Sequence, residues 1–309
     1  MSEPINRIKH ELGDDLLQKL KRLSPSDFNS IMLEVYRMRT DSLRPSDILR
    51  SYAGSRFSKP SELDPVAYHQ LEAELLGLAR QHDIQPVLLS PVAPLGNCSS
   101  YGTVDQNKIV SASRGTEVLA DSTNMMATIA ADRIKQGIGS HDEGAHLCST
   151  HRVVRAQQFN GPGSFAHFGI YGMVSVGKAR GSYQCEANLL GKQLGYYQAL
   201  FRSRFHAELS VVLEQRSGYA DGAGFLTRMA AIIQEQLPEA SITVQEPNET
   251  NSYYKGINFK LFMTNQHGRT EIGDGGFVDW TQIMLGNQKE RCLISGIGLD
   301  RLILMELNA

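Results

Sequence analysis

Two segments decide the fold that this sequence predicts: RVVRAQ at residues 152–157 and FGIYGMVSVG at residues 168–177. Both are strand-like, and a glycine-bearing loop that includes residues 160–163 separates them. Three further runs are strand-like, at residues 108–112, 241–244 and 257–263. The order of these segments indicates an α+β domain built around a mainly antiparallel sheet.

Helical patterns lie on either side of these strands. Residues 65–82 are amphipathic, and Pro65 occupies a first-turn position where its missing N–H costs nothing. A helical block is predicted over residues 186–237. Near the C-terminus, residues 293–305 are interpreted as a glycine turn that enters a helix. We therefore expect a sheet flanked by helices.

The first 60 residues have a different pattern. Leucines recur at helical spacing over residues 16–23, and the sequence Ser-Pro-Ser-Asp at 24–27 is typical of a stop followed by a new helix cap. The stretch GSRFSKP at 54–60 is interpreted as a linker. The predicted division is an all-α extension over residues 1–60 and a core over residues 61–309.

Composition narrows the class of protein. The chain has 309 residues, of which 41% are hydrophobic and 21% charged, with a net charge of −2. These values do not indicate a disordered chain and argue against a strongly basic nucleic-acid binder, although a local basic patch stays open.

Cysteine usage and hydropathy bear on the compartment. The sequence has no run of about 18 apolar residues and no apolar signal-peptide core, so no membrane span or membrane partner is expected. The cysteines lie far apart and form no CxxC pair, which favours free thiols in a reducing compartment. The expected location is the cytoplasm. The four cysteines are Cys98, Cys148, Cys185 and Cys292.

The strand pair 152–157 and 168–177 resembles motif 2 of the class II aminoacyl-tRNA synthetases, in which two antiparallel strands flank a loop over the nucleotide. Arg155 matches the motif's arginine. An arginine at a strand end is rigid and always charged, so it can stabilise an α-phosphate while negative charge develops there. Ser90-Pro91, after a helix and an apolar run, resembles motif 1 at the dimer interface.

Three further segments extend the resemblance to about residues 63–309. GIGLDR at 296–301 resembles motif 3, whose glycines approach ATP and whose arginine lies against adenine. LADST at 119–123 resembles the histidyl-type strand that binds the ligand's amino group. YYKGINF at 253–259 and GDGGFVD at 273–279 resemble the paired tyrosines and Gly-Gly turn of the histidyl branch.

The resemblance implies a set of site residues. The catalytic residue would be Arg155. Nucleotide binding would involve Arg155, Gln157, Phe168, Gly298 and Arg301, and substrate binding would involve Asp121, Thr123, Tyr253, Tyr254, Gly275 and Gly276. It also implies ATP, Mg²⁺ bridging the phosphates, a homodimer, and an amino acid or similar carboxylate that forms an acyl-adenylate. The acceptor or partner stays open between tRNA, a carrier protein and a partner enzyme.

Departures from the family pattern support a second reading. Gln157 stands where motif 2 has an acidic residue, Ser164 where it has Arg or His, and Glu249 where the histidyl branch has Arg. His167 is a candidate to replace the missing motif 2 side chain. No anticodon-binding domain is expected after motif 3. These features resemble the non-catalytic regulatory subunit of ATP phosphoribosyltransferase, which is the alternative function.

Structural explanations stay open for several of these residues. Arg155 and Arg301 could be ordinary strand-end and helix-start arginines, and Asp121 could cap the following helix. Tyr253 and Tyr254, if they share a strand, point to opposite faces, so only one would face a pocket. Residues 141–151 hold many metal-ligand side chains, but their spacing matches no zinc pattern, so no metal site is predicted.

Overall fold

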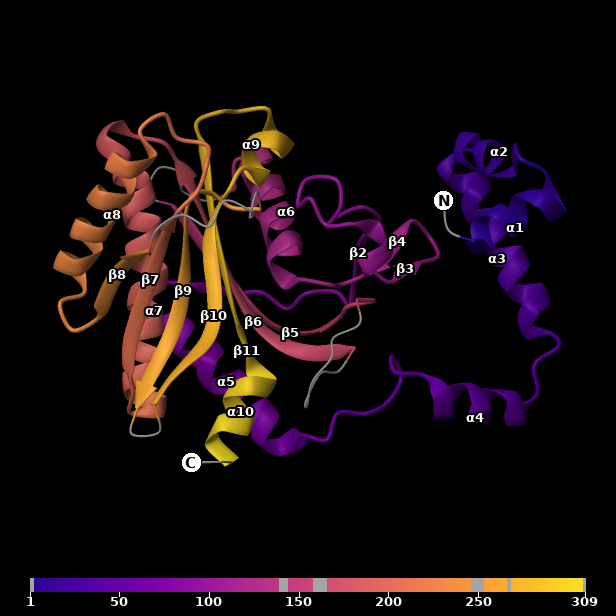
Figure 1. Ribbon diagram of the computed structural model, residues 1–309, viewed down its shortest axis with the longest axis horizontal. Coiled ribbons are helices and arrows are strands. Elements are labelled where there is room, and N and C mark those ends of the chain that lie inside the picture. Colours follow the sequence, from indigo (N-terminus) through magenta and orange to yellow (C-terminus); the bar gives the residue numbers. More distant parts are fainter. Residues whose placement is uncertain (1–2, 139–143, 158–165, 246–252, 266–267, 308–309) are drawn as a thin grey trace.

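The computed structural model describes residues 3–138, 144–157, 166–245, 253–265 and 268–307. Its core is a sheet with helices on both faces, and four N-terminal helices extend away from it (Figure 1). The α+β class and the sheet flanked by helices are confirmed.

The main sheet has eight strands in the order β1-β5-β6-β11-β10-β9-β7-β8. Its two outer pairs, β1 with β5 and β7 with β8, are parallel, and the inner pairs are antiparallel. The strands are β1 Gln85–Pro86, β5 Ala145–Val154, β6 His167–Lys178, β7 Glu208–Gln215, β8 Ser241–Gln245, β9 Lys255–Asn265, β10 Gly268–Val278 and β11 Glu290–Gly298. The mainly antiparallel sheet is therefore confirmed.

Helices cover both faces of this sheet (Figure 1). One face carries α5 Pro65–Gln81, α7 Gln184–Phe205 and α8 Gly222–Gln236. The opposite face carries α6 Ser122–Lys135 and α9 Trp280–Leu285, beside a small sheet of β2 Val92–Pro94, β3 Ser111–Ala112 and β4 Thr116–Val118. The helix α10 Leu299–Leu307 follows β11, and short 3₁₀ turns span Gln106–Lys108 and Gly181–Tyr183.

Each face of the sheet has its own hydrophobic core. Tyr197 and Phe259 are fully buried under the α5–α7–α8 layer, and Met126 and Trp280 are buried under α6 and α9. Burying one such side chain contributes about 1.5–3 kcal/mol. The α6 layer comes close to the sheet at Gly172, where a Cβ would lie 2.5 Å from the Ser122 Oγ. This glycine lets the N-terminus of α6 rest on β6.

The predicted helical block over residues 186–237 is wrong in its middle. Strand β7 separates α7 from α8, and α7 ends at His206, whose φ of 48° is left-handed. The run Leu-Ser-Val-Val-Leu at 209–213 is apolar and β-branched, so it pairs with β9 rather than continuing the helix.

Three smaller expectations also need correction. Of the run 108–112, Lys108 ends a 3₁₀ turn that Asp105 caps through the Asn107 N–H, and only Ser111 and Ala112 are in a strand, β3. In the motif 1 region only Gln85 and Pro86 are in a strand. The predicted glycine turn at 293–298 belongs to strand β11, which leads directly into α10.

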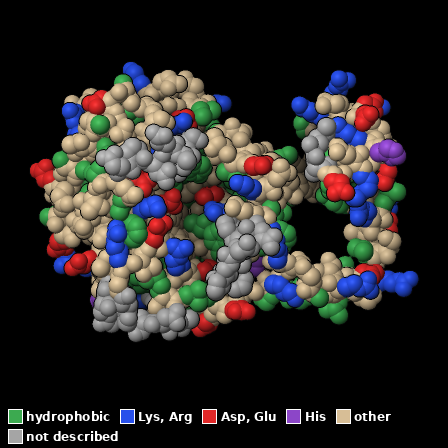
Figure 2. All heavy atoms as spheres, in the orientation of Figure 1, with side chains coloured by type: hydrophobic (Ala, Val, Ile, Leu, Met, Phe, Trp, Pro, Cys, Tyr) green, Lys and Arg blue, Asp and Glu red, His purple; other side chains and the backbone are tan. Residues whose placement is uncertain are grey.

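The N-terminal extension consists of α1 Glu3–Leu12, α2 Leu16–Arg22, α3 Pro25–Thr40 and α4 Pro45–Gly54. None of these helices has a buried residue, and hydrophobic side chains are exposed along them (Figure 2). The residues after α4 do contact the core. Arg56 donates to the carbonyl oxygens of Ala156 and Gln157, and the Lys59 carbonyl accepts from His167 Nε2 at 2.6 Å.

Deletion of residues 1–60 should leave a folded core, because the four helices contribute no buried side chain to it. The boundary at residue 60 stays a prediction that this truncation tests. A cooperative urea transition of the 61–309 fragment is the expected result. An insoluble fragment, or one that unfolds without cooperativity, would show that the extension is part of the core.

Among the described residues, none of the helices combines the length and the hydropathy that a membrane-spanning helix needs.

Candidate ligand-binding site

Two adjoining cavities open at the start of β6, the end of β11 and the middle of β10, beside the first turn of α6. The larger has a volume of about 660 Å³ and the smaller about 400 Å³. Of the residues selected from the sequence, the larger cavity is lined by Asp121, Thr123, Arg155, Phe168, Tyr253, Tyr254, Gly298 and Arg301. The smaller is lined by Asp121, Arg155, Gln157, Tyr253 and Tyr254.

The β5–β6 hairpin brings the two ends of motif 2 together. Val153 pairs with Phe168 in the antiparallel register, and the Arg155 N–H donates to the Ala166 carbonyl at 2.8 Å. The Arg155 guanidinium carbon lies 5.1 Å from the centre of the Phe168 ring. The two residues therefore form one corner of the larger cavity.

Asp121 is the N-cap of α6, as one of the structural explanations proposed. Its Oδ1 accepts from the backbone N–H and the hydroxyl of Thr123, both at 2.8 Å. Its Oδ2 lies 3.3 Å from Arg155 Nη2, and Arg155 Nε donates to the Ala120 carbonyl at 3.0 Å. Protein groups already occupy both oxygens of Asp121, so this carboxylate serves as the helix cap and as the partner of Arg155.

Motif 3 contributes to the wall of the larger cavity as well. Gly298 ends β11, and Arg301 lies in the first turn of α10, where its Nη1 donates to the Glu271 carbonyl at 2.7 Å. The Arg301 side chain is exposed, so its planar group is accessible to a ligand from the cavity.

Both tyrosines line the cavities, contrary to the expectation that only one would. They precede β9, which begins at Lys255, so the alternation of a strand does not apply to them. Their ring centres are 4.9 Å apart at an interplanar angle of 89°. The Tyr253 ring also meets the buried Trp280 edge-on, 5.7 Å between centres, which fixes its orientation.

Gly275 and Gly276 do not line either cavity. A Cβ at Gly276 would lie 2.5 Å from Tyr254 Cδ1, and one at Gly275 would lie 2.5 Å from the Ile294 carbonyl oxygen. These glycines lie beneath the cavity, where they make room for the Tyr254 ring and for the neighbouring strand.

Asp274 is a site residue that the sequence reasoning missed. It lines both cavities, and the Tyr254 hydroxyl donates to its Oδ2 at 2.9 Å. This side chain is exposed to the cavities, and the protein atoms around them still displace part of its hydration. The resulting loss of hydration is the main cause that raises the pKa of Asp274, and repulsion from Asp121 and Glu271 adds to it. Its place next to the expected Gly-Gly turn was the available signal.

Two buried residues in the wall of the smaller cavity were also missed. The Asn124 side chain is 1% exposed, and neither its Nδ2 nor its Oδ1 has a hydrogen-bond partner among the described residues. Cys98 is 2% exposed, and burial raises the pKa of its thiol to about 12, so the thiol stays protonated. Asn124 lies one turn into a helix, where sequence alone does not distinguish a wall residue from a core residue.

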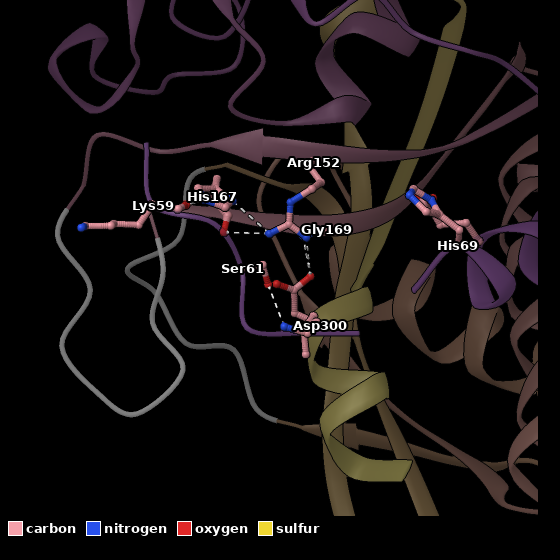
Figure 3. Close-up of polar contacts among 9 residues, drawn as sticks. Lys59, Ser61, His69, Arg152, His167, Gly169 and Asp300 are labelled. Atoms are coloured by element: carbon pink, nitrogen blue, oxygen red, sulfur yellow. Dashed lines mark hydrogen bonds and ion pairs between the residues drawn. The ribbon is translucent and has the colours of Figure 1, made fainter. Parts of the chain in front are cut away.

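A polar network ties motif 2 to motif 3 at the edge of the larger cavity, which two of its members, Gly169 and Asp300, line (Figure 3). Arg152 Nη2 donates to His167 Nδ1 at 2.9 Å, and Arg152 Nη1 lies 3.5 Å from Asp300 Oδ1, which also accepts from the Gly169 N–H at 2.8 Å. His167 Nε2 donates to the Lys59 carbonyl. His167 lines neither cavity, so it does not replace the missing motif 2 side chain there.

Some of the selected residues lie outside the described part of the chain. These are Ser164, Glu249, the loop 160–163 and the first part, 141–143, of the segment rich in metal-ligand side chains. Among the described residues, no three His, Cys, Asp or Glu side chains gather into a metal-binding group.

Comparison with known proteins shows which solved structures share this fold. No protein-family model matches the chain, and no curated protein sequence matches it. Solved structures do match. An ATP phosphoribosyltransferase regulatory subunit/histidyl-tRNA synthetase from Bacillus halodurans superposes with a TM-score of 0.59 at 10% identity, covering 80% of this chain and 81% of its own.

Two synthetases are similar to the chain in the same way. The histidyl-tRNA synthetase of S. aureus has a TM-score of 0.59 at 14% identity, with 82% of this chain and 69% of that one covered. A putative threonyl-tRNA synthetase from Aeropyrum pernix has a TM-score of 0.61 at 12% identity, with 78% and 59% covered. The class II synthetase-like core is thereby confirmed as the fold of this chain.

Proposed function

We propose that this class II synthetase-like chain binds ATP in the larger cavity and an amino acid, or a similar small carboxylate, in the smaller one, and joins them as an acyl-adenylate. One observation carries the proposal. Arg155 lies in the wall that both cavities share. In an acyl-adenylate the α-phosphate lies between the nucleotide and the acyl group, where a shared arginine is needed.

The residues present fit ATP. A volume of about 660 Å³ is in the range of small-molecule sites. Phe168 and Arg301 supply an aromatic ring and an exposed planar cation for an adenine, and Gly298 allows close backbone approach. For Mg²⁺, the exposed carboxylate of Glu271 in the same wall supplies the oxygen ligand that this ion prefers. The ion would neutralise phosphate charge.

The proposed chemistry rests on position and charge rather than on acid–base catalysis. A carboxylate oxygen of the ligand attacks the α-phosphorus of ATP, the new P–O bond forms, and pyrophosphate leaves. Arg155 stabilises the negative charge that develops on the α-phosphate oxygens. The carbonyl of Ala120 and the Asp121 carboxylate hold the guanidinium in place before the ligands bind, so little reorganisation is needed.

ATP–pyrophosphate exchange against a panel of amino acids tests this function. Exchange that depends on one amino acid is the expected result. Absence of exchange with every amino acid, in the presence of Mg²⁺, would contradict adenylation and leave ligand binding as the activity.

A second candidate, a non-catalytic ligand-sensing subunit, is favoured by the charge around the cavities. Among the described lining residues, carboxylates outnumber cations: Asp105, Asp121, Glu271, Asp274 and Asp300 against Lys108, Arg155 and Arg301. Such a wall disfavours a triphosphate unless metal ions accompany it. Tight amino-acid binding without exchange, together with binding to a partner enzyme, would support this candidate.

We also propose that the chain forms a homodimer through its motif 1 region. Leu88, just after β1 at the edge of the sheet, is 97% exposed, and covering a leucine is worth about 1.5–3 kcal/mol. Light scattering at micromolar concentration should give twice the chain mass, and Leu88→Asp should give a monomer. Ile283→Asp on α9, an equally drastic change at another exposed position, is the control. A monomeric wild-type protein would contradict the proposal.

A further inference from the structure

The carboxylate of Asp274 has unused hydrogen-bonding capacity at the cavity wall. Tyr254 donates to its Oδ2, while no donor among the described residues reaches its Oδ1. Asp121 is different, because Thr123 and Arg155 occupy both of its oxygens. Of the two carboxylates that the cavities share, Asp274 is therefore the one that has an oxygen available for a ligand donor.

The buried amide of Asn124, in the wall of the smaller cavity, is an independent indication of a ligand. Asn124 is 1% exposed, lines the smaller cavity, and leaves both side-chain amide atoms without a partner among the described residues. Leaving a buried polar group unpaired is costly, so such groups are rare in native proteins. A ligand that fills the smaller cavity and donates to the Asn124 Oδ1 would remove the part of this cost that the unpaired amide oxygen causes.

The aromatic part of the wall suits a positively charged group. Tyr253 and Tyr254 meet edge-to-face at the junction of the cavities. The negative face of an aromatic ring attracts a cation, and more strongly where water is displaced. Two tyrosine rings, a carboxylate oxygen and an amide oxygen together form a site for a cationic nitrogen.

The charge of the smaller cavity agrees with this reading. Its cations are Arg155, already paired with Asp121, and Lys108, which is exposed at the mouth. Asp274, beside the rings, is attracted by the Arg155 charge, but no cation among the described residues forms an ion pair with it. A neutral side chain would leave that charge unpaired, and an acidic one would be repelled by it.

We propose that the smaller cavity selects the side chain of a basic amino acid, with its cationic nitrogen donating to Asp274 Oδ1 and to the Asn124 amide oxygen. The inference rests on the proposed function, which places the amino acid in this cavity. To that function it adds the chemical class of the amino acid's side chain. The ligand's carboxylate is left to face Arg155, where activation would occur.

Calorimetric titration with matched pairs of ligands tests the proposal without ATP and with EDTA present. L-Arginine should bind about tenfold or more tightly than L-citrulline, its neutral isostere, and L-lysine more tightly than L-norleucine. Equal or tighter binding of the neutral member of both pairs would overturn the inference while leaving the proposed function standing. If no amino acid of any charge binds, the result contradicts both the inference and the proposed function.

A charge-neutral variant of Asp274 makes the test specific to this residue. Asp274→Asn keeps the acceptor for the Tyr254 hydroxyl, so the fold should persist, and the preference for L-arginine over L-citrulline should disappear. Asp132→Asn, which removes the same charge from an exposed position on α6 away from both cavities, should keep it. Retention of the full preference in Asp274→Asn, confirmed folded by its melting curve, would overturn the assignment.

The pH dependence of binding supplies a second measurement. The pKa of Asp274 is raised, so its carboxyl takes up a proton at a pH above that at which an ordinary aspartate titrates. L-Arginine affinity should fall as the pH is lowered through that range, because the protonated carboxyl no longer attracts a cation. Asp274→Asn should lack this fall. A wild-type affinity for L-arginine that stays constant down to the ordinary aspartate range would contradict the role of Asp274.

Discussion

Replacing Arg155 with alanine should lower the rate of amino-acid-dependent ATP–pyrophosphate exchange by about a hundredfold to a thousandfold, which corresponds to about 3–4 kcal/mol of transition-state stabilisation. Arg155 lies in the wall that both cavities share, beside the Phe168 ring, and its guanidinium is held by Asp121 and the Ala120 carbonyl. An interaction that strengthens as charge develops on the α-phosphate affects the rate more than it affects ligand binding.

The fold of this variant should be almost unchanged. The Arg155–Asp121 pair is partly exposed, with side-chain exposures of 32% and 26%, so its loss should cost about 1 kcal/mol or less. Arg133→Ala is a matched control, because Arg133 donates to Gln85 away from both cavities. If the Arg155 variant keeps most of the wild-type exchange rate, the assignment of the phosphate ligand and the motif 2 alignment must be withdrawn.

Replacing Arg291 with alanine should destabilise the protein by about 3–5 kcal/mol. Arg291 at the start of β11 donates from Nε to Glu186 Oε1 at 2.6 Å, and Glu186 in the first turn of α7 is 1% exposed. Removal of the cation leaves that carboxylate buried with only the Tyr219 hydroxyl as a partner among the described residues. The urea unfolding midpoint measures the loss.

The double variant Glu186→Leu with Arg291→Met separates the cost of an unpaired charge from the value of the pair. Apolar residues of similar volume often replace a buried ion pair with little change in stability. The double variant should therefore recover most of the loss seen in Arg291→Ala. Equal destabilisation of the single and double variants would show that the shape of these side chains, rather than charge, holds α7 to β11.

The local sequence pattern predicted those helices and strands whose hydrophobic residues recur with the period of the structure they form. The run 168–176 lies within β6, and residues 65–82 correspond closely to α5. Strand β7 was missed because it lies between two long helices, and only its contact with β9 makes the apolar run 209–213 extended. The local pattern of this run fits either a helix or a strand, and pairing with β9, which is distant in sequence, makes it a strand.

The candidate site was predictable only where a motif marked it. Arg155 and Arg301 were selected from short strings and do line the larger cavity. Asp274 lies within the Gly-Asp-Gly-Gly string but was not selected from it, and Asn124 carries no such mark. Their importance comes from neighbours contributed by other elements, the Tyr254 hydroxyl for Asp274 and the absence of a partner for Asn124, which a sequence does not display.

The glycines of the central strands have a consequence for how the protein tolerates mutation. A methyl group at Gly172 or Gly276 would strike Ser122 at the start of α6 or the Tyr254 ring, and these groups hold the cavity walls in place. In a random library selected only for folding, these positions should therefore stay glycine. Exposed cavity residues such as Lys108 should tolerate many substitutions. A screen for folding alone, without any ligand, would thus identify the glycines that support the candidate site. It would not identify the exposed residues that line it.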